Sequence, residues 1–317
     1  MIDLNNRAGG PSLVVTAKTA NKVQFFDATG FTLMGEIDMP ASTHEMVLSP
    51  DGRHAFASVY GGGIFGKNAA PDRRIAVIDL VTQSVAHMID VGEDVAPHGL
   101  MFDQDGMLWC TAELASAAMV IDPRSGAIER IETEKPAHWL AISHATDTVF
   151  ASCKTSDFIA VIDRKTRRMT GKLPMPELAE GLAVSPDGET LFVCAHRKPQ
   201  LSVFDVRNRR LRETLTITGG EGKPDQLKRV RISPQGKYVC VSSLLDSHVA
   251  IFDAASLKQI ASIATPKAPM GFGFAADERL AYVCCHDAAE MLGFELATGR
   301  VTRKVATASG CEFVISY

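Results

Sequence analysis

The fold is decided by a stretch in the middle of the chain that reads Glu180-Gly181-Leu182-Ala183-Val184-Ser185-Pro186-Asp187-Gly188. A short apolar run leads into Ser-Pro-Asp-Gly, whose proline and glycine suit a tight turn between antiparallel strands. A second apolar run follows at residues 191–194, and after a polar gap a third run ends at residue 205. The phrase predicts consecutive short strands that are separated by turns.

The same phrase recurs along the whole chain. Further copies of the turn begin at Ser49, Asp103, Ser143, Ser233 and Ala275. Third runs that end in an acidic residue occupy residues 23–27, 75–79, 119–122, 159–163, 201–205, 249–253 and 291–295. A period of about 40–50 residues with four short strands per unit is typical of a β-propeller blade. The sequence therefore predicts an all-β, seven-bladed β-propeller with four antiparallel strands per blade, as one domain over residues 1–317.

The two ends of the chain complement each other in this pattern. Residues 12–17 match the second strand of a unit, and residues 311–317 match a first strand with nothing after it. We expect the N- and C-terminal strands to pair in one blade, because that pairing leaves no open sheet edge.

Composition and charge exclude several classes of protein. Lysine plus arginine number 33 against 37 aspartate plus glutamate, and the net charge of −4 provides no field for binding nucleic acid. No apolar run approaches the length of a membrane span. The first residues lack the basic and apolar regions of a signal peptide, so we expect a cytoplasmic location unless a leader has been removed. The seven cysteines include no CxxC pair and are expected to be reduced and buried.

The repeats resemble the YVTN type of seven-bladed propeller over essentially the whole chain. The stretch from Glu180 to Gly188 is very close to that family's consensus, whereas no third strand ends in the Trp-Asp pair of WD40 repeats. The resemblance implies the fold and says little about function.

Alignment of the units places polar residues at one end of the ring. The first residues of the innermost strands form a column of His44, His98, His138, Glu180, Lys228, Met270 and Cys311. The last residues of the second strands form a column of Tyr60, Glu113, Lys154, His196, Ser243, His286 and Lys18. Because successive strands alternate in direction, both columns lie on one face, where residues 61–74 and 218–227 are insertions. Long loops on one rim of a rigid scaffold usually carry function.

Three consecutive blades contribute a histidine to the first column, and the fourth contributes a glutamate. Neutral imidazole and carboxylate suit Zn²⁺, Fe²⁺ or Mn²⁺. We therefore predict a divalent transition metal held by His44, His98, His138 and Glu180. Its acid–base partners would be Glu113, His196 and His286. The alternative is that a half-solvated rim tolerates polar residues and that no metal binds.

Six further residues are candidates for substrate binding: Lys154, Lys228, Arg229, Arg231, Trp139 and Tyr60. The lysines could anchor a carboxylate or phosphate, and an arginine could hold a carboxylate in a bidentate contact. The tryptophan could stack on a planar substrate. The alternatives are that acidic residues of other blades neutralise the arginines, and that the tryptophan packs in the core.

Three functions fit these residues. The main hypothesis is a metal-dependent enzyme, a lyase or a hydrolase, that acts on a small organic substrate at the loop-rich mouth of the channel. Pro97-His98-Gly99 and Ile121-Asp122-Pro123 resemble the repeat of the streptogramin (virginiamycin B) lyases, although Ala112 separates a threonine and a glutamate that are adjacent in that repeat. The alternatives are a non-catalytic propeller that binds a protein partner at the insertions, and a lactonase-type hydrolase similar to the known seven-bladed sugar lactonases.

Overall fold

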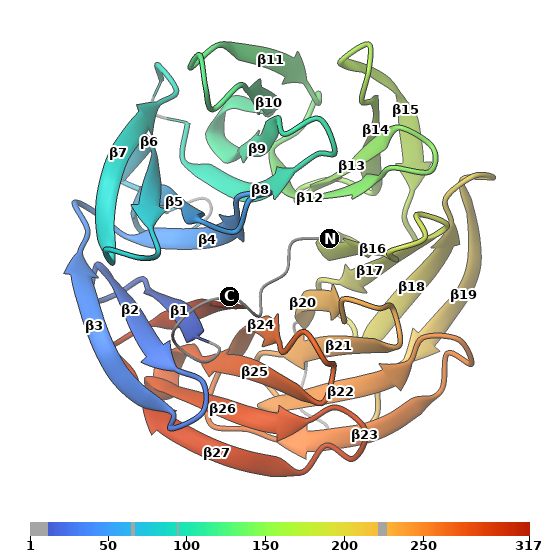
Figure 1. Ribbon diagram of the computed structural model, residues 1–317. Helices are drawn as coiled ribbons and strands as arrows, with labels where there is room; N and C mark the ends of the chain where they lie inside the picture. The colour runs from blue at the N-terminus through green and yellow to red at the C-terminus, as the bar shows by residue number, and fades with distance from the viewer. Residues whose placement is uncertain (1–11, 65–66, 94, 221–226) are drawn as a thin grey trace.

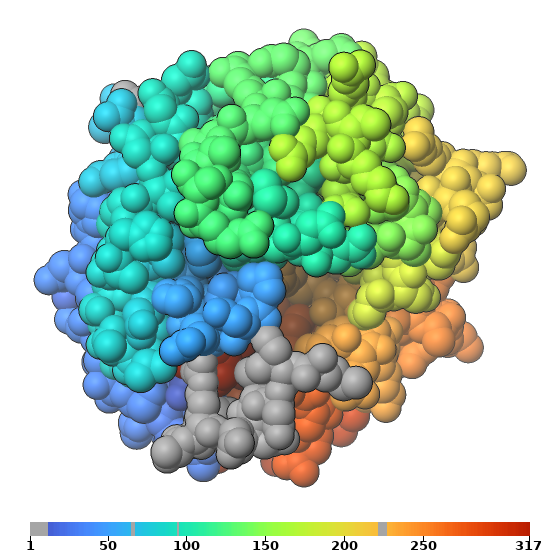
Figure 2. All heavy atoms as spheres, turned by 45° about the horizontal axis from the view of Figure 1, so that its top comes forward, coloured from blue at the N-terminus to red at the C-terminus, as the bar shows by residue number. Residues whose placement is uncertain are grey.

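The computed structural model describes residues 12–64, 67–93, 95–220 and 227–317. Seven antiparallel sheets of four strands stand around a central axis (Figure 1). In the space-filling view, successive blades form successive sectors from blue through green and yellow to red (Figure 2). The predicted all-β, seven-bladed propeller is confirmed.

Each blade runs from an innermost strand to an outermost strand. The blades are β28 (Cys311–Ser316), β1 (Ser12–Ala17), β2 (Lys22–Asp27), β3 (Thr32–Asp38); β4 (Thr43–Leu48), β5 (His54–Gly62), β6 (Ala70–Asp79), β7 (Ser84–Asp90); β8 (Pro97–Phe102), β9 (Leu108–Ala112), β10 (Ala117–Ile121), β11 (Ile128–Glu132); β12 (Ala137–Ser143), β13 (Thr148–Cys153), β14 (Phe158–Asp163), β15 (Arg168–Pro174); β16 (Ala179–Val184), β17 (Thr190–Ala195), β18 (Gln200–Asp205), β19 (Arg210–Thr216); β20 (Leu227–Ile232), β21 (Tyr238–Ser243), β22 (His248–Asp253), β23 (Gln259–Ala264); and β24 (Pro269–Phe274), β25 (Leu280–Cys285), β26 (Glu290–Glu295), β27 (Val301–Ala306).

The ring closes through the two ends of the chain. Strand β28 pairs antiparallel with β1, and Val14 lies opposite Ile315 in the register. Each innermost strand contacts the innermost strand of the next blade, and β28 contacts β4 in the same way. The predicted pairing of the N- and C-terminal strands is therefore confirmed.

The repeated turn connects the first and second strands of a blade. In the blade that begins with β4, the Ser49 hydroxyl donates to Asp51 Oδ1 at 2.6 Å, and the Gly52 amide donates to the Ser49 carbonyl at 2.8 Å. Gly52 has a φ of +66°, a conformation that glycine adopts without steric cost. These turns lie at the end of each blade opposite the two polar columns.

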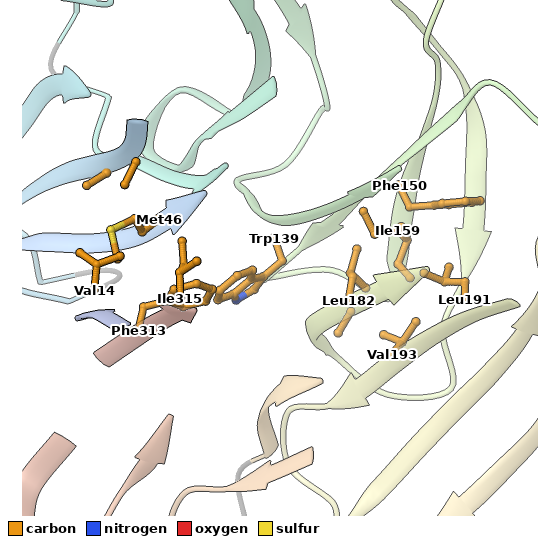
Figure 3. Packing of buried hydrophobic residues seen from close by; sticks show 14 of the residues in the cluster. Val14, Met46, Trp139, Phe150, Ile159, Leu182, Leu191, Val193, Phe313 and Ile315 are labelled. Carbon is orange, nitrogen blue, oxygen red and sulfur yellow. The ribbon is translucent and has the colours of Figure 1, made fainter. Parts of the chain in front are cut away.

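The core lies between neighbouring blades and around the hub, which is the ring of seven innermost strands about the central axis. Strands β13 and β21 are buried along their whole length, whereas β3 and β19 are largely exposed. In Figure 3 the indole of Trp139 lies close to Phe313 and Ile315 within one apolar cluster. All seven cysteines are buried and free, as the sequence predicts.

Close packing of the innermost strands explains the glycines beside the hub. A Cβ atom on Gly181 would lie 2.7 Å from the Lys228 carbonyl oxygen and 3.0 Å from the Val230 nitrogen, both in the next blade. Those backbone atoms cannot move aside without shifting a strand. The hub therefore requires glycine at this position, and the polar residues around it are held on a rigid ring.

The predicted insertion at residues 61–74 is partly strand and not wholly loop. Strands β5 and β6 continue into it, and Gly62 pairs with Ala70. Gly61 and Gly63 have φ angles of +93° and +133°, so glycine allows this extension to bend. In the second insertion, residues 221–226 lie outside the described residues. Within the described part of the chain, no helix has the length and apolar character of a membrane span.

Candidate functional site

Side chains from all seven blades converge on a cavity of about 630 Å³ at one mouth of the channel. Eleven of the residues predicted from the sequence line it: Tyr60, His44, His98, His138, Glu113, Lys154, Glu180, His196, Lys228, Arg229 and His286. Lys18 and Met270, which belong to the two sequence columns, also line it, as do residues outside those columns: Ile64, Leu244, Leu245, Ser247, Lys267, Ala268, Asp287 and Glu312. The two sequence columns thus meet in space.

One position in the strand explains this convergence. His44, His98, His138 and Glu180 are each the second residue of an innermost strand. In the last blade the equivalent residue is Glu312, which lines the cavity, and not Cys311 as the sequence alignment predicts. The alignment misses it because the terminal strand offers no following strand to fix its register.

Three imidazole rings lie side by side along the cavity floor. The ring centroids of His44 and His98 are 4.3 Å apart, and those of His98 and His138 are 4.0 Å apart. Burial lowers the pKa of His44 and of His98 well below the ordinary value, and the neighbouring cationic groups lower it further. Both rings are therefore neutral at physiological pH, the form in which imidazole binds metals.

Glu113 reaches His138 from the preceding blade. Strand β9 ends at Ala112, and the short 3₁₀ helix η2 (Glu113–Ala115) directs the carboxylate to His138 Nδ1, at 2.5 Å from Oε1. The Tyr60 hydroxyl donates to the other carboxylate oxygen. Burial disfavours the charged carboxylate, but His138, Lys154 and Tyr60 together outweigh it and hold the pKa of Glu113 below its usual range.

Glu180 is the centre of a second polar cluster. Its Oε2 lies 3.0 Å from His196 Nδ1, and its Oε1 lies 3.4 Å from Lys228 Nζ and 3.7 Å from Lys154 Nζ. Burial disfavours the charge, yet the surrounding His138, Lys154 and Lys228 hold the pKa of Glu180 well below its usual range. Burial in turn lowers the pKa of Lys154.

Arg229 is held by acidic residues of other blades, the alternative that the sequence left open. One guanidinium nitrogen lies 2.6 Å from Glu45 Oε1 and 3.5 Å from Glu312 Oε1. The guanidinium carbon lies 3.9 Å from the ring centroid of Trp139, so it stacks on the indole. Burial raises the pKa of Glu45 to about 7, although Arg229 opposes the rise. This cluster forms part of the hub below the cavity.

Two predicted substrate-binding residues do not reach the cavity wall. Trp139 packs in the core beneath Arg229, and the Arg231 guanidinium lies over the Phe313 ring at 5.1 Å. Arg231 is two residues further along β20 than Arg229, which places it deeper in the hub. Neither side chain lines the cavity, so the prediction of direct substrate contact is corrected for both.

The cavity is chemically two-sided. The histidines and acidic residues belong mainly to the four blades that contain β4, β8, β12 and β16. On the opposite side, Leu244 and Leu245 lie between β21 and β22, and Met270 lies in β24. His286 lies on this apolar side, where its Nδ1 is 2.8 Å from the Asp287 carboxylate. The wall therefore offers both charged and apolar contacts.

Two groups of three side chains bring possible metal ligands within 4.8 Å of one another. One group is His98, Glu113 and His138, and the other is His44, Glu45 and His98. Glu180 belongs to neither group, although the sequence predicts it as a ligand. The structure thus keeps the predicted histidines together and places a different carboxylate among them.

Comparison with known proteins supports the fold. No family model matches the chain. The chain is 25% identical over 190 residues to antigen Lp49 of Leptospira interrogans. The matched region covers 56% of this chain and 40% of that protein. The chain thus spans less than half of that curated relative. The YVTN and streptogramin lyase resemblances stay predictions.

Several solved structures share the architecture. A periplasmic gluconolactonase of Pseudomonas aeruginosa matches 96% of this chain and 98% of its own, with a TM-score of 0.78 and 17% identity. The hydrazine synthase of Kuenenia stuttgartiensis covers 86% of this chain and 89% of its own, with a TM-score of 0.74 and 17% identity. A dihydro-heme d1 dehydrogenase covers 96% of this chain and 74% of its own, with a TM-score of 0.66 and 12% identity. These likenesses show the seven-bladed fold.

The comparison also corrects one expectation. The cytoplasmic location predicted from the sequence is contradicted, because the gluconolactonase of similar fold is periplasmic by its own description.

Proposed function

We propose that the chain is a hydrolase that opens a small anionic cyclic ester, a lactone, at the mouth of the channel. The observation that carries this proposal is the pairing of His196 with Glu180 at the edge of a cavity lined by cations. Of the two reactions predicted from the sequence, hydrolysis is the one carried out by a protein of similar fold, the gluconolactonase. That likeness favours a lactone over other esters.

His196 is suited to act as the general base. Its Nδ1 lies 3.0 Å from Glu180 Oε2, and a proton held on Nδ1 beside that carboxylate would leave the Nε2 lone pair to accept a proton from water. The side chain is 19% exposed, whereas the Glu180 side chain is 1% exposed. A buried carboxylate thus orients a ring that water can reach, the arrangement that general-base catalysis needs.

The surrounding charge favours an anionic substrate. Lys18, Lys154, Lys228 and Lys267 all line the cavity. Such cations would bind a carboxylate and stabilise the negative charge that develops on the carbonyl oxygen during attack. The apolar wall at Leu244 and Met270 would contact the hydrocarbon part of the substrate.

The reaction balances with water alone. Water gives one proton to His196 as its oxygen bonds to the carbonyl carbon. The acyl–oxygen bond then breaks, and His196 returns the proton to the ring oxygen. One lactone and one water yield one hydroxy acid. Each step uses a proton acceptor or a cation that lies in the cavity wall.

A lactone panel tests this proposal. We would follow acid release in a pH-stat with glucono-δ-lactone and with γ- and δ-lactones that carry a carboxylate or a phosphate. The His196→Gln variant should lose roughly 10²–10⁴-fold in kcat, the range for removal of a general base. His54→Gln is the matched control, because His54 begins β5 at the far end of its blade. Hydrolysis at the buffer rate for the whole panel, or equal rates for both variants, would overturn the proposal.

A further inference from the structure

His98 is a polar side chain buried without a polar partner. It is fully buried, and neither Nδ1 nor Nε2 has a hydrogen-bond partner among the described residues. Its neighbours are the faces of other rings: His44, His138 and Trp139, the last at 5.1 Å between centroids. A buried donor or acceptor that makes no hydrogen bond destabilises the fold by about 1–3 kcal/mol. Its position at the cavity floor indicates a ligand.

The donors around His98 form a coordinating set. His98, Glu113 and His138 each offer a ligand atom, and these atoms lie within 4.8 Å of one another. His98 and His138 lie in the innermost strands of two neighbouring blades, and Glu113 directly follows the second strand of the first of these blades. All three side chains are buried, so they are held in place. Two neutral imidazoles and one carboxylate match Zn²⁺, Fe²⁺ and Mn²⁺ sites that keep positions open for water or substrate.

We propose that His98, Glu113 and His138 hold one divalent transition-metal ion at the floor of the cavity. The ion would lie between His138 Nδ1 and Glu113 Oε1, two atoms that are 2.5 Å apart in this structure and would have to separate slightly to admit it. It would also give the partnerless imidazole of His98 a bond. Three protein ligands leave room for a bound water or a carbonyl oxygen, which the metal polarises.

A second shell supports these ligands. Glu180 Oε1 lies 3.3 Å from His138 Nε2 and would accept its proton, which orients the ring for coordination through Nδ1. The Tyr60 hydroxyl holds the outer oxygen of Glu113. The ammonium group of Lys154 lies on the ring edge of His138 that faces away from Glu113, with its Nζ 3.2 Å from Nε2.

The other candidate group is less suited to a cation. It contains His44, Glu45 and His98, and Glu45 Oε1 already binds the Arg229 guanidinium at 2.6 Å. A metal there would lie beside a fixed positive charge. The ligand set therefore differs from the sequence prediction at two positions: Glu113 replaces Glu180, and His44 belongs to the hub cluster.

The inference does not depend on hydrolysis, because its readout is metal binding. Protein purified without a histidine tag would be stripped with a chelator and titrated with Co²⁺, followed by visible absorption and elemental analysis. We expect one equivalent per chain, with the intense visible bands of a low-coordinate cobalt site. Glu113→Gln, which keeps the side chain's shape, and His98→Ala should each abolish stoichiometric binding.

Two further variants separate a built site from adventitious binding. Glu180→Gln should weaken Co²⁺ binding by about 10–100-fold, the range for a second-shell partner. His286→Ala is the matched control, because His286 lines the same cavity outside the ligand set and should keep the full equivalent. Circular dichroism would establish that each variant is folded. Substoichiometric metal in the unmodified chain, or equal loss in His286→Ala and Glu113→Gln, would overturn the site.

The two proposals can fail separately. A chain that binds one equivalent of Co²⁺ but hydrolyses no lactone would contradict the proposed function and leave the metal site standing. A chain that binds no metal, and that hydrolyses lactones equally well with and without the ligand residues, would contradict the metal site and leave the proposed function standing.

Discussion

Replacement of Arg229 by methionine would separate a structural role of this residue from a role in substrate binding. The guanidinium is 2% exposed, lies 2.6 Å from Glu45 and 3.5 Å from Glu312, and stacks on Trp139. Removing one partner of a buried ion pair leaves an uncompensated charge and typically destabilises a protein by about 3–5 kcal/mol. We expect a loss of this size in the free energy of unfolding at pH 8.

The loss should depend on pH because of Glu45. Its folded-state pKa of about 7 is raised from 4.5, so its contribution to stability is present below pH 4.5 and is lost as the pH rises through about 7. Arg229 lowers this pKa, so its removal extends that loss to higher pH. At pH 5.5 Glu45 is already protonated in the unmodified protein, and a hydrogen bond to a neutral group is about half as strong. We therefore expect the destabilisation at pH 5.5 to be about half of that at pH 8.

Urea unfolding followed by circular dichroism at both pH values measures these differences. Arg212→Met, at an exposed position of β19, is the control and should stay within about 0.5 kcal/mol of the unmodified chain. The double variant Arg229→Met/Glu45→Gln should recover part of the loss at pH 8, since no charge then remains on Glu45. A loss below about 1 kcal/mol at pH 8, or a loss that is identical at both pH values, would refute the reasoning.

Three further outcomes follow from the fold and the buried histidines. Deletion of β28 should abolish soluble folding, because its buried Phe313, Val314 and Ile315 each contribute about 1.5–3 kcal/mol and together approach the stability of a whole domain; a truncated chain with an unchanged melting temperature would contradict this. Gly181→Ala should cost about 1–3 kcal/mol by thermal unfolding, because its Cβ would meet the Lys228 carbonyl at 2.7 Å. The control Gly62→Ala meets only the Ala70 Cβ at 3.8 Å, and an equal effect of the two changes would argue against hub crowding. Burial lowers the pKa of His44, so the metal-free protein should lose stability as the pH falls below 6.5, by about 1.4 kcal/mol per pH unit for this histidine. His44→Gln should reduce that slope in urea titrations at pH 7, 6 and 5, and an unchanged slope would show that the ring is not buried in its neutral form.

The architecture could be predicted from the sequence because its signal is repeated. The turn at Ser49 and its copies mark each blade, and the alternation of strand direction then determines which residues share a face. The convergence of His44, His98 and His138 follows from their equivalent positions in adjacent blades. One alignment of the seven repeat units is therefore enough to place these histidines at the same end of the ring.

Finer features of the site could not be predicted in this way. The carboxylate of Glu113 reaches His138 only because β9 ends one residue before it and a short 3₁₀ helix begins there. The pairing of Arg229 with Glu45 joins residues 184 positions apart across the hub. Glu312 occupies the ring position of the last blade through the register of β28 against β1. These contacts depend on side-chain direction across the axis, about which a repeat pattern carries no information.

The distribution of the cavity-lining residues over seven equivalent blades has a consequence for how the specificity of this site can be altered. Every blade places cavity-lining side chains at the same two backbone positions, so the seven blades present them in equivalent ways around one opening. A substitution at the cavity-lining position of one innermost strand, such as Met270, would change one part of the wall and keep the equivalent side chains of the other six blades. New specificities could therefore arise, or be engineered, one sector at a time.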